Sequence, residues 1–181
     1  MSHVLITGSS EGLGLAAAQL LAQQGHDVIL NGRNPRRSHI AMTRVPTAGG
    51  VVTGDFSTIA DIRNVAVQAN KLGPFDTVIH NAGVGFQEAT RGTTIDGHSR
   101  VLSVNVLAPY LLTALMTPPK RLVYLSRGLH QSGDDSLRDI DWQSRPWNGF
   151  QAYNDSRLFD ATLAFAIARH GLGTVSTALE P

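Results

Sequence analysis

The chain has 181 residues, a length that suits one domain with a core large enough to fold unaided. Hydrophobic residues make up 42% of it and the formal net charge is +1, so the composition points neither to nucleic acid nor to an anionic membrane surface. The absence of cysteine excludes disulfides and thiolate metal sites and favours a cytoplasmic location. The seven histidines show no pair at metal-ligand spacing, and no apolar run approaches the roughly 18 residues of a membrane span.

Short apolar runs alternate with helical periodicity through the first half of the chain. Residues 3–7 predict a strand that starts too early to leave room for a signal peptide. Leucine and alanine recur at helical spacing over residues 13–21, and Gly25 ends that helix. The pattern continues with strands at 27–30, 51–53 and 77–80, a weak helix and loop over 34–50, and a helix over 58–71.

The second half repeats this alternation with longer helices. We predict a long helix around residues 95–116, a strand at 121–125, a helix over about 150–170 and a sixth strand at 174–178. Continuous apolar strands separated by amphipathic helices indicate a mostly parallel sheet covered on both faces. The predicted fold is therefore α/β and doubly wound, with three α/β/α layers and a ligand crevice at the carboxyl ends of the strands.

No repeat or linker divides the chain, so residues 1–181 are expected to form a single domain. The polar stretch 128–149 is the longest irregular segment. Because it follows the fifth strand, it should form a loop over the crevice rather than a domain boundary.

A glycine-rich turn joins the first strand to the first helix. It reads Thr7-Gly8-Ser9-Ser10-Glu11-Gly12-Leu13-Gly14. Glycines allow a tight turn and let backbone N–H groups approach a pyrophosphate, which the helix N-terminus also attracts. On its own such a turn is also compatible with an ordinary strand-to-helix connection.

Further motifs follow in a fixed order, and together with this turn they resemble the short-chain dehydrogenase/reductase family, whose fold is of the Rossmann type. The turn matches the family's TGxxxGxG, and Asn81-Ala82-Gly83 matches its NAG turn. Asp55, followed by Phe56, occurs where the family contacts adenine. Asn105 and Tyr153 stand at its active-site asparagine and tyrosine, and Glu180-Pro181 resembles the start of its Pro-Gly turn.

The resemblance covers essentially the whole chain. It implies an NAD(P)-dependent oxidoreductase that reduces a carbonyl or oxidises a secondary alcohol, both small molecules. The cofactor contacts that it implies are Thr7, Gly8, Ser9, Ser10, Glu11, Gly12, Leu13, Gly14, Arg33, Asp55, Phe56, Asn81, Ala82, Gly83, Tyr153 and Arg157.

The end of the second strand, Leu30-Asn31-Gly32-Arg33, bears on the choice of coenzyme. An acidic residue there would bind the ribose 2′-OH and repel a 2′-phosphate. Gly32 occupies that place, and Arg33 follows with a fork suited to phosphate, so NADP is favoured and NAD is the second choice. Glu11 argues mildly for NAD, since NADP-preferring relatives often carry a basic residue there.

The family's chemistry implies four roles. Its tyrosine is the general acid/base, its serine binds the substrate oxygen, its lysine holds the nicotinamide ribose and favours the phenolate, and its asparagine supports a proton relay. Tyr153 and Asn105 match the first and last roles, whereas Arg157 replaces the lysine and Arg127 the serine. An arginine keeps the positive charge but not the compact ammonium head.

Ser126 is the fallback for the serine, although strand alternation turns it to the other face. The predicted catalytic set is accordingly Tyr153, Arg157, Ser126 and Asn105. Because two of these positions depart from the family, a catalytically silent NADP(H)-binding sensor or assembly protein stays open as the alternative.

Other residues leave alternatives open. His130 is expected either to line the substrate pocket or to make a hydrogen bond within its own loop. Trp142 and Trp147 are expected either to form an apolar lid or to anchor the core. Tyr110 is expected to pack in the long helix. Asp155 and Ser156 are expected at exposed helix positions.

By resemblance the chain forms a homodimer or homotetramer through the long helix and the tyrosine helix, and the apolar side chains of Val101, Val104, Leu111 and Leu115 are compatible with that. The family continues past Glu180-Pro181 with a substrate loop and a last strand. We therefore expect a fragment, the alternative being a sheet edge covered by another subunit.

Overall fold

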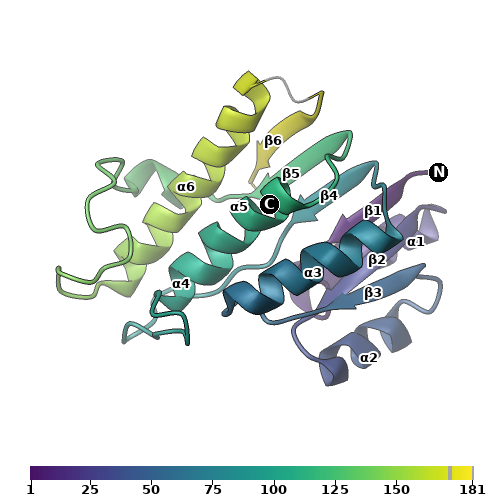
Figure 1. The fold of residues 1–181 in the computed structure, drawn as a ribbon, viewed down its shortest axis with the longest axis horizontal. Coiled ribbons are helices and arrows are strands. Elements are labelled where there is room, and N and C mark those ends of the chain that lie inside the picture. The colour runs from purple at the N-terminus through teal and green to yellow at the C-terminus, as the bar shows by residue number, and fades with distance from the viewer. Residues whose placement is uncertain (171–172, 181) are drawn as a thin grey trace.

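The computed structural model describes residues 1–170 and 173–180, in which six parallel strands form one sheet (Figure 1). Their order across the sheet is β3-β2-β1-β4-β5-β6, so the chain winds outward from β1 in both directions. The predicted doubly wound α/β fold is confirmed. The strands are β1 (His3–Ile6), β2 (Asp27–Gly32), β3 (Gly50–Thr53), β4 (Thr77–His80), β5 (Arg121–Leu125) and β6 (Val175–Leu179).

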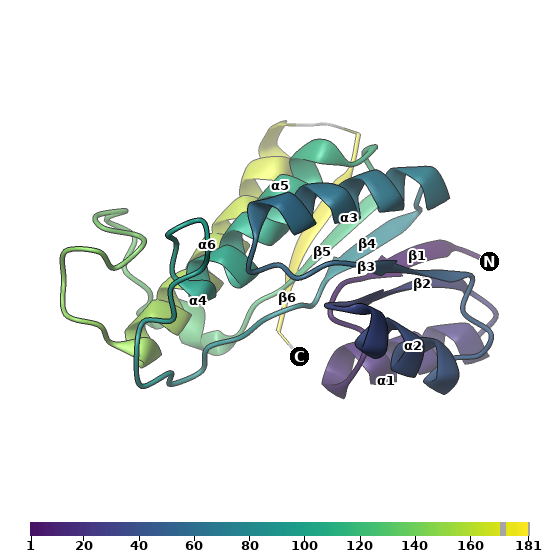
Figure 2. The ribbon, with the colours of Figure 1, turned by 60° about the horizontal axis from the view of Figure 1, so that its bottom comes forward.

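Helices cover both faces of this sheet (Figure 2). On one face lie α1 (Gly12–Gln23) and α2 (Pro35–Arg44), and on the other lie α3 (Ile59–Leu72), α5 (Ala108–Leu115) and α6 (Gly149–His170). Alternation along β1 separates two cores, because Leu5 packs under α3 and α5 whereas Val4 and Ile6 pack against α1 and α2. Both faces of the sheet are thereby covered by buried apolar side chains.

Side-chain caps set where several helices begin. The Asn34 side chain accepts a hydrogen bond from the Arg37 N–H, with Pro35 at the first helical position of α2. Thr58 caps α3 in the same way through the Asp61 N–H. Such caps satisfy backbone donors that a helix leaves unpaired, which stabilises the short α2 despite its charged sequence.

The long helix predicted around residues 95–116 begins later than expected. It starts with α4 (Arg100–Leu102), where Ser99 caps the Leu102 N–H, and Ile95 lies in a preceding loop with 87% of its surface exposed. A π-helical turn, η1 (Ser103–Leu107), then joins α4 to α5. The prediction failed at this end because a turn closed by the Thr94 N–H and the His98 carbonyl interrupts the apolar pattern.

The structure also bears on two further expectations about this helix. Tyr110 was expected to pack, yet 53% of it is exposed because it lies on the face of α5 turned away from the sheet. Val101 and Val104 are buried within the described chain, so they cover its core instead of offering an apolar face to a second subunit. Among the described residues, no helix combines the length and apolar character needed to cross a bilayer.

Candidate functional site

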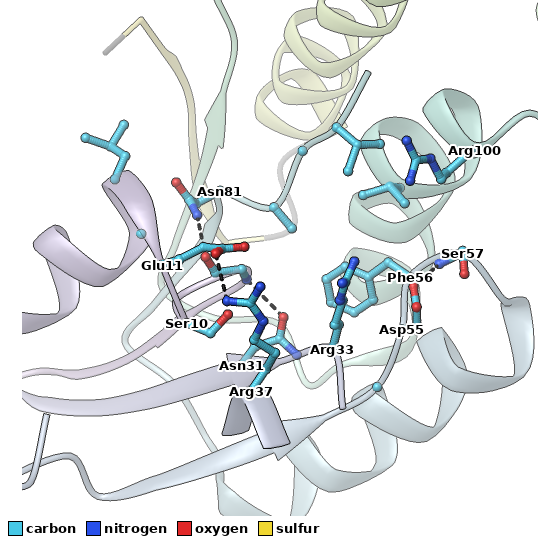
Figure 3. A pocket seen from close by; sticks show the side chains of 18 residues that line it. Ser10, Glu11, Asn31, Arg33, Arg37, Asp55, Phe56, Ser57, Asn81 and Arg100 are labelled. Carbon is cyan, nitrogen blue, oxygen red and sulfur yellow. Dashed lines mark hydrogen bonds and ion pairs between the residues drawn. The ribbon is translucent and has the colours of Figure 1, made fainter. Parts of the chain in front are cut away.

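A cleft of about 460 Å³ opens at the carboxyl ends of the central strands (Figure 3). Its walls come from the glycine turn, from the segments after β2, β3 and β4, and from η1. Eleven of the predicted cofactor contacts line it, which places residues from four separate segments around one space: Gly8, Ser10, Glu11, Leu13, Gly14, Arg33, Asp55, Phe56, Asn81, Ala82 and Gly83. Thr7, Ser9 and Gly12 belong to the same turn without lining the cleft, and the predicted contacts Tyr153 and Arg157 do not line it either.

The glycine turn packs directly on the segment after β4. Gly8 has a φ of 63°, and a Cβ built on it would lie 2.8 Å from the Ala82 Cα. The Asn81 side chain donates to the Thr7 carbonyl at 2.8 Å and to the Gly8 carbonyl at 3.2 Å. These contacts leave the backbone N–H groups of the turn at the cleft, next to the N-terminus of α1, which is the arrangement that a diphosphate requires.

Asn31, at the end of β2, holds this turn in shape, and the sequence analysis assigned it no role. Its side-chain oxygen accepts from the Gly8 N–H at 2.9 Å, and its own N–H donates to the Ser9 Oγ at 2.8 Å. The Ser9 hydroxyl in turn donates to the Ile6 carbonyl. A polar residue closing an otherwise apolar strand was the available signal, because a buried amide needs partners.

At the mouth of the cleft, one arginine is engaged in an ion pair and another, Arg33, can contact a ligand. Glu11 pairs with Arg37 at 2.8 Å, so the acidic residue that argued for NAD is neutralised by a neighbouring cation. Arg33 is exposed, and no carboxylate in the described part of the chain pairs with it. Figure 3 shows Arg33 and Arg37 extending from the end of β2 and the start of α2 into the cleft.

Tyr153 and Arg157 lie next to each other on α6, as their spacing predicts. The Arg157 guanidinium carbon is 4.9 Å from the centre of the Tyr153 ring. The Arg157 guanidinium lies against Gly83, so close that a Cβ on this glycine would collide with it. Arg157 therefore reaches the segment after β4 that lines the cleft. Tyr153 is 8% exposed and meets Phe86 edge to face at 5.4 Å.

Asp160 is a buried partner of Arg157 that the sequence analysis did not single out. The same Arg157 nitrogen, Nη1, donates to Asp160 at 2.9 Å and to the Leu125 carbonyl at 3.0 Å. Burial raises the pKa of Asp160 to about 7, against the opposing effect of the guanidinium beside it. When Asp160 is ionised, its negative charge lies beside the Arg157 guanidinium, which in turn lies beside Tyr153.

The pH dependence of stability tests this pair through Asp160→Asn. Because the folded-state pKa is raised, the stabilising contribution of Asp160 is complete below pH 3.8 and is lost as pH rises to about 7. The free energy of unfolding of the parent, relative to Asp160→Asn, should thus fall by about 1.4 kcal/mol per pH unit in this window. Urea unfolding at several pH values measures it, with the exposed Asp135→Asn as control. A difference that stays constant with pH would contradict the raised pKa.

Asn105, on the π-helical turn, ties three segments of the site together. Its side chain accepts from the Val84 N–H at 2.9 Å, donates to the Val84 carbonyl at 3.0 Å, and donates to the Ser156 Oγ at 2.9 Å. The Ser156 hydroxyl donates to the Tyr153 carbonyl. One asparagine thus fixes the loop after β4 relative to the helix that carries the tyrosine. Irregular helical turns of this kind often occur at functional sites.

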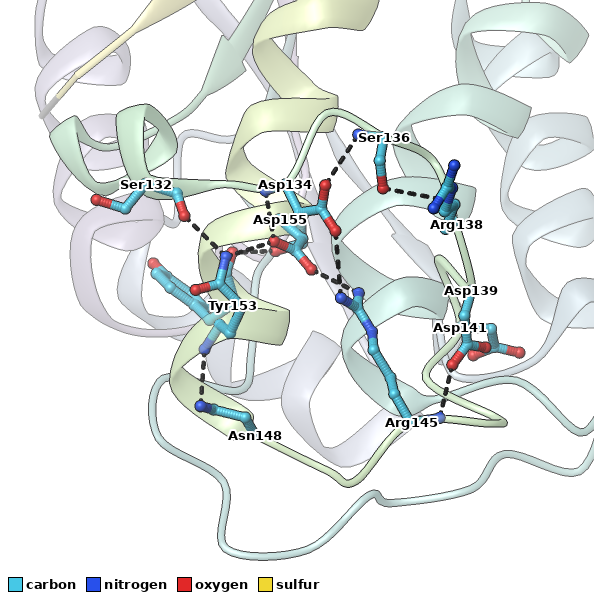
Figure 4. Close-up of polar contacts among 12 residues, drawn as sticks. Ser132, Asp134, Ser136, Arg138, Asp139, Asp141, Arg145, Asn148, Tyr153 and Asp155 are labelled. Carbon is cyan, nitrogen blue, oxygen red and sulfur yellow. Dashed lines mark hydrogen bonds and ion pairs between the residues drawn. The ribbon is translucent and has the colours of Figure 1, made fainter.

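The expectation that Asp155 and Ser156 are exposed was wrong, since each is only 2% exposed. The loop over residues 133–148 covers Asp155 (Figure 4), whereas Ser156 is held by Asn105 on η1. Asp155 accepts from the Asp134 N–H at 2.8 Å and pairs with Arg145 at 3.0 Å. Sequence spacing could not show this, because the covering loop has no periodic pattern.

Aromatic residues anchor the same loop to its surroundings. Trp142 is 6% exposed, with the Arg145 guanidinium carbon 3.6 Å from its ring centre. Trp147 meets Trp142 edge to face and donates from Nε1 to the Glu88 carbonyl at 2.9 Å. For Trp142 this geometry matches the core-anchor alternative, and Trp147 joins the 133–148 loop to the loop that follows β4.

Comparisons with known proteins agree with this geometry. The family profile described as short chain dehydrogenase matches residues 2–123. The chain belongs to the short-chain dehydrogenase family. It is 48% identical over 171 residues to an uncharacterized oxidoreductase of Emericella nidulans, covering 93% of this chain and 64% of that protein. It is 39% identical over 184 residues to the short-chain dehydrogenase chry4 of Gibberella zeae, covering 100% and 70% of the two chains.

Solved structures show the same fold. A protein from Mycobacterium paratuberculosis superposes with a TM-score of 0.87 at 28% identity, covering all of this chain and 68% of that one. A short-chain dehydrogenase from Sphingobium yanoikuyae, solved in complex with NADPH, superposes with a TM-score of 0.76 at 21% identity. The superposition covers 100% of this chain and 70% of that one. The chain thus spans about two thirds of the length of these relatives, and of the first curated one slightly less.

In this member of the family, two neighbouring residues after β5 are candidates for the family's serine position. Ser126 is 8% exposed, and its hydroxyl donates to the Arg157 carbonyl at 3.0 Å. Arg127 is exposed and turns instead toward the Phe86 ring. His130 donates from Nδ1 to the Arg127 carbonyl at 2.6 Å, which matches the loop-histidine alternative. Glu180 accepts from the Gly128 N–H, and Pro181 lies outside the described residues.

Proposed function

We propose that this protein is an NADP-dependent oxidoreductase that reduces a carbonyl or oxidises a secondary alcohol, with Tyr153 as the general acid/base. One observation carries the proposal. Gly83 lines the cleft built by the glycine turn, and the Arg157 guanidinium beside Tyr153 lies against that residue. A dinucleotide laid along the cleft would therefore place its far end beside the phenol.

The residues present suit the coenzyme. The backbone of the glycine turn and the N-terminus of α1 would hold the diphosphate, and Asp55 and Phe56 lie where an adenine would rest. Gly8 fits because any side chain there would strike Ala82 and close the turn against it. When bound, the nicotinamide donates or accepts the hydride.

The protein's part in the reaction is to move a proton. The Tyr153 hydroxyl would protonate the carbonyl oxygen during reduction and take that proton back during alcohol oxidation. Arg157 would stand for the family's lysine, favouring the phenolate by its charge and binding ribose. Asn105 would hold the tyrosine helix in register through Ser156. Ser126 already donates its only proton to Arg157, so we propose for it an orienting role.

The preference for NADP should depend on Arg33. Its exposed guanidinium lines the cleft and can bind a 2′-phosphate with charge-assisted hydrogen bonds. Arg33→Ala is expected to weaken NADPH binding by about tenfold or more while NADH binding stays unchanged. Titrations followed by coenzyme fluorescence measure both. Arg36→Ala, an exposed arginine that does not line the cleft, is the matched control; equal losses for NADPH and NADH would refute the assignment.

A second candidate function rests on the hydrogen bonds that the Arg157 guanidinium already makes within the protein. Arg157 is tied to Asp160 and to Leu125, so the protein would bind NADP(H) without turning over a substrate, as a sensor or an assembly partner. Two measurements separate the candidates: NADPH binding, and NADPH oxidation with a panel of aldehydes, ketones and quinones. The double change Arg127→Ser with Arg157→Lys sharpens the test. Activity gained only by that variant supports the silent protein, and activity in the parent supports the enzyme.

A further inference from the structure

Arg127 is a cation separated from Tyr153 by the Phe86 ring, and it has no carboxylate partner among the described residues. Arg127 lies two residues after the end of β5, it is exposed, and its guanidinium carbon is 5.4 Å from the centre of the Phe86 ring. By contrast, other arginines near the cleft and its covering loop pair with carboxylates, among them Arg37, Arg91, Arg100, Arg145 and Arg157. No carboxylate within the described residues pairs with Arg127, and Glu180 binds the next residue's N–H instead.

Exposed aromatic rings continue from this cation to the phenol. Phe86 and Phe150 are 49% and 40% exposed, which is unusual for rings that form one cluster. Phe86 meets Phe150 at 6.1 Å and Tyr153 at 5.4 Å, edge to face in both cases. One ring thus separates the guanidinium from the proposed acid/base, and both exposed rings lie beside the place where a substrate would react.

We propose that Arg127, Phe86 and Phe150 select substrates that carry a carboxylate and a flat apolar body next to the reacting carbonyl. The guanidinium presents a planar fork that binds a carboxylate through two hydrogen bonds. A cation–π contact with Phe86 supports the guanidinium at this place. The aromatic rings bury the flat body of the substrate. The inference rests on the proposed function for the position of the carbonyl, but the carboxylate contact itself needs no turnover.

A matched pair of ketones tests the selection. The probes are para-acetylbenzoate and its neutral amide, para-acetylbenzamide, with NADPH oxidation as readout. We expect the parent to prefer the acid in kcat/KM, and Arg127→Ala to reduce that preference by about tenfold or more, mainly through KM. Arg127→Lys should retain part of the preference. Arg138→Ala removes an exposed arginine of the neighbouring loop and should leave the preference for the acid unchanged.

Equilibrium binding keeps this inference separate from the proposed activity. The same probes are titrated against the NADPH-loaded chain. Phe86→Ala should weaken both probes, the acid more than the amide because Arg127 loses its support, and Arg127→Ala should weaken only the acid. If the acid binds in an Arg127-dependent way but no ketone is reduced, the proposed function fails and the anion site stands. Turnover or binding that treats acid and amide alike in the parent would overturn the anion site, as would a preference that survives Arg127→Ala.

Discussion

Replacing Tyr153 with phenylalanine is expected to lower the rate of NADPH-dependent carbonyl reduction by about a hundredfold to ten-thousandfold, because the substrate oxygen loses its proton donor. The ring itself should stay in place. Its contacts in the structure are made by the aromatic face and edge, with Arg157 at 4.9 Å and Phe86 at 5.4 Å. The hydroxyl can therefore be removed without disturbing the packing around it.

Steady-state kinetics with a substrate found in the carbonyl panel measure this loss. NADPH affinity and the midpoint of thermal unfolding serve as controls, and both should match the parent. Ser126→Ala should cost much less activity, since its hydroxyl proton is already donated to Arg157. If Tyr153→Phe retained full activity while Ser126→Ala lost it, the proton would have to come from another group and the proposed role of Tyr153 would be wrong.

The layout of the fold could be predicted because it depends on periodicity. Apolar runs of strand length alternating with helical spacing specify a parallel sheet, and the carboxyl edge of such a sheet is where its ligands bind. That rule, with the glycine turn and the segment Asn81–Gly83, predicted the segments that line the observed cleft. Local sequence patterns were enough to predict those features that depend on residues within a single helix, strand or turn.

Contacts between distant segments could not be predicted in this way. Asn31 supports the glycine turn across 23 residues of sequence, and Asn105 reaches Ser156 across 51. The burial of Asp155 depends on a loop without periodicity. Asp160 shares a helix face with Arg157, so helical spacing would have revealed that pair once a buried cation was expected to need a partner.

The strongest test of the coenzyme cleft is Gly8→Ala, compared with Gly25→Ala. Both glycines have a positive φ, 63° and 83°, so alanine costs about 1–2 kcal/mol of backbone strain at either position. Only at Gly8 would the new Cβ meet backbone, 2.8 Å from the Ala82 Cα, whereas nothing lies within 4 Å at Gly25. Gly8→Ala should therefore lose an additional ~1–3 kcal/mol of unfolding free energy from overpacking.

Coenzyme binding should separate the two variants further. The Gly8 N–H is held by Asn31, so pushing the turn away from Ala82 moves the amides that would bind the diphosphate. We expect NADPH affinity to fall by about a hundredfold or more in Gly8→Ala, the equivalent of at least two lost charge-assisted hydrogen bonds. Gly25→Ala lies at the far end of α1 and should bind NADPH as the parent does. Equal affinity in both variants would mean that the coenzyme does not rest on this turn, and the proposed placement of the nicotinamide beside Tyr153 would then lose its anchor.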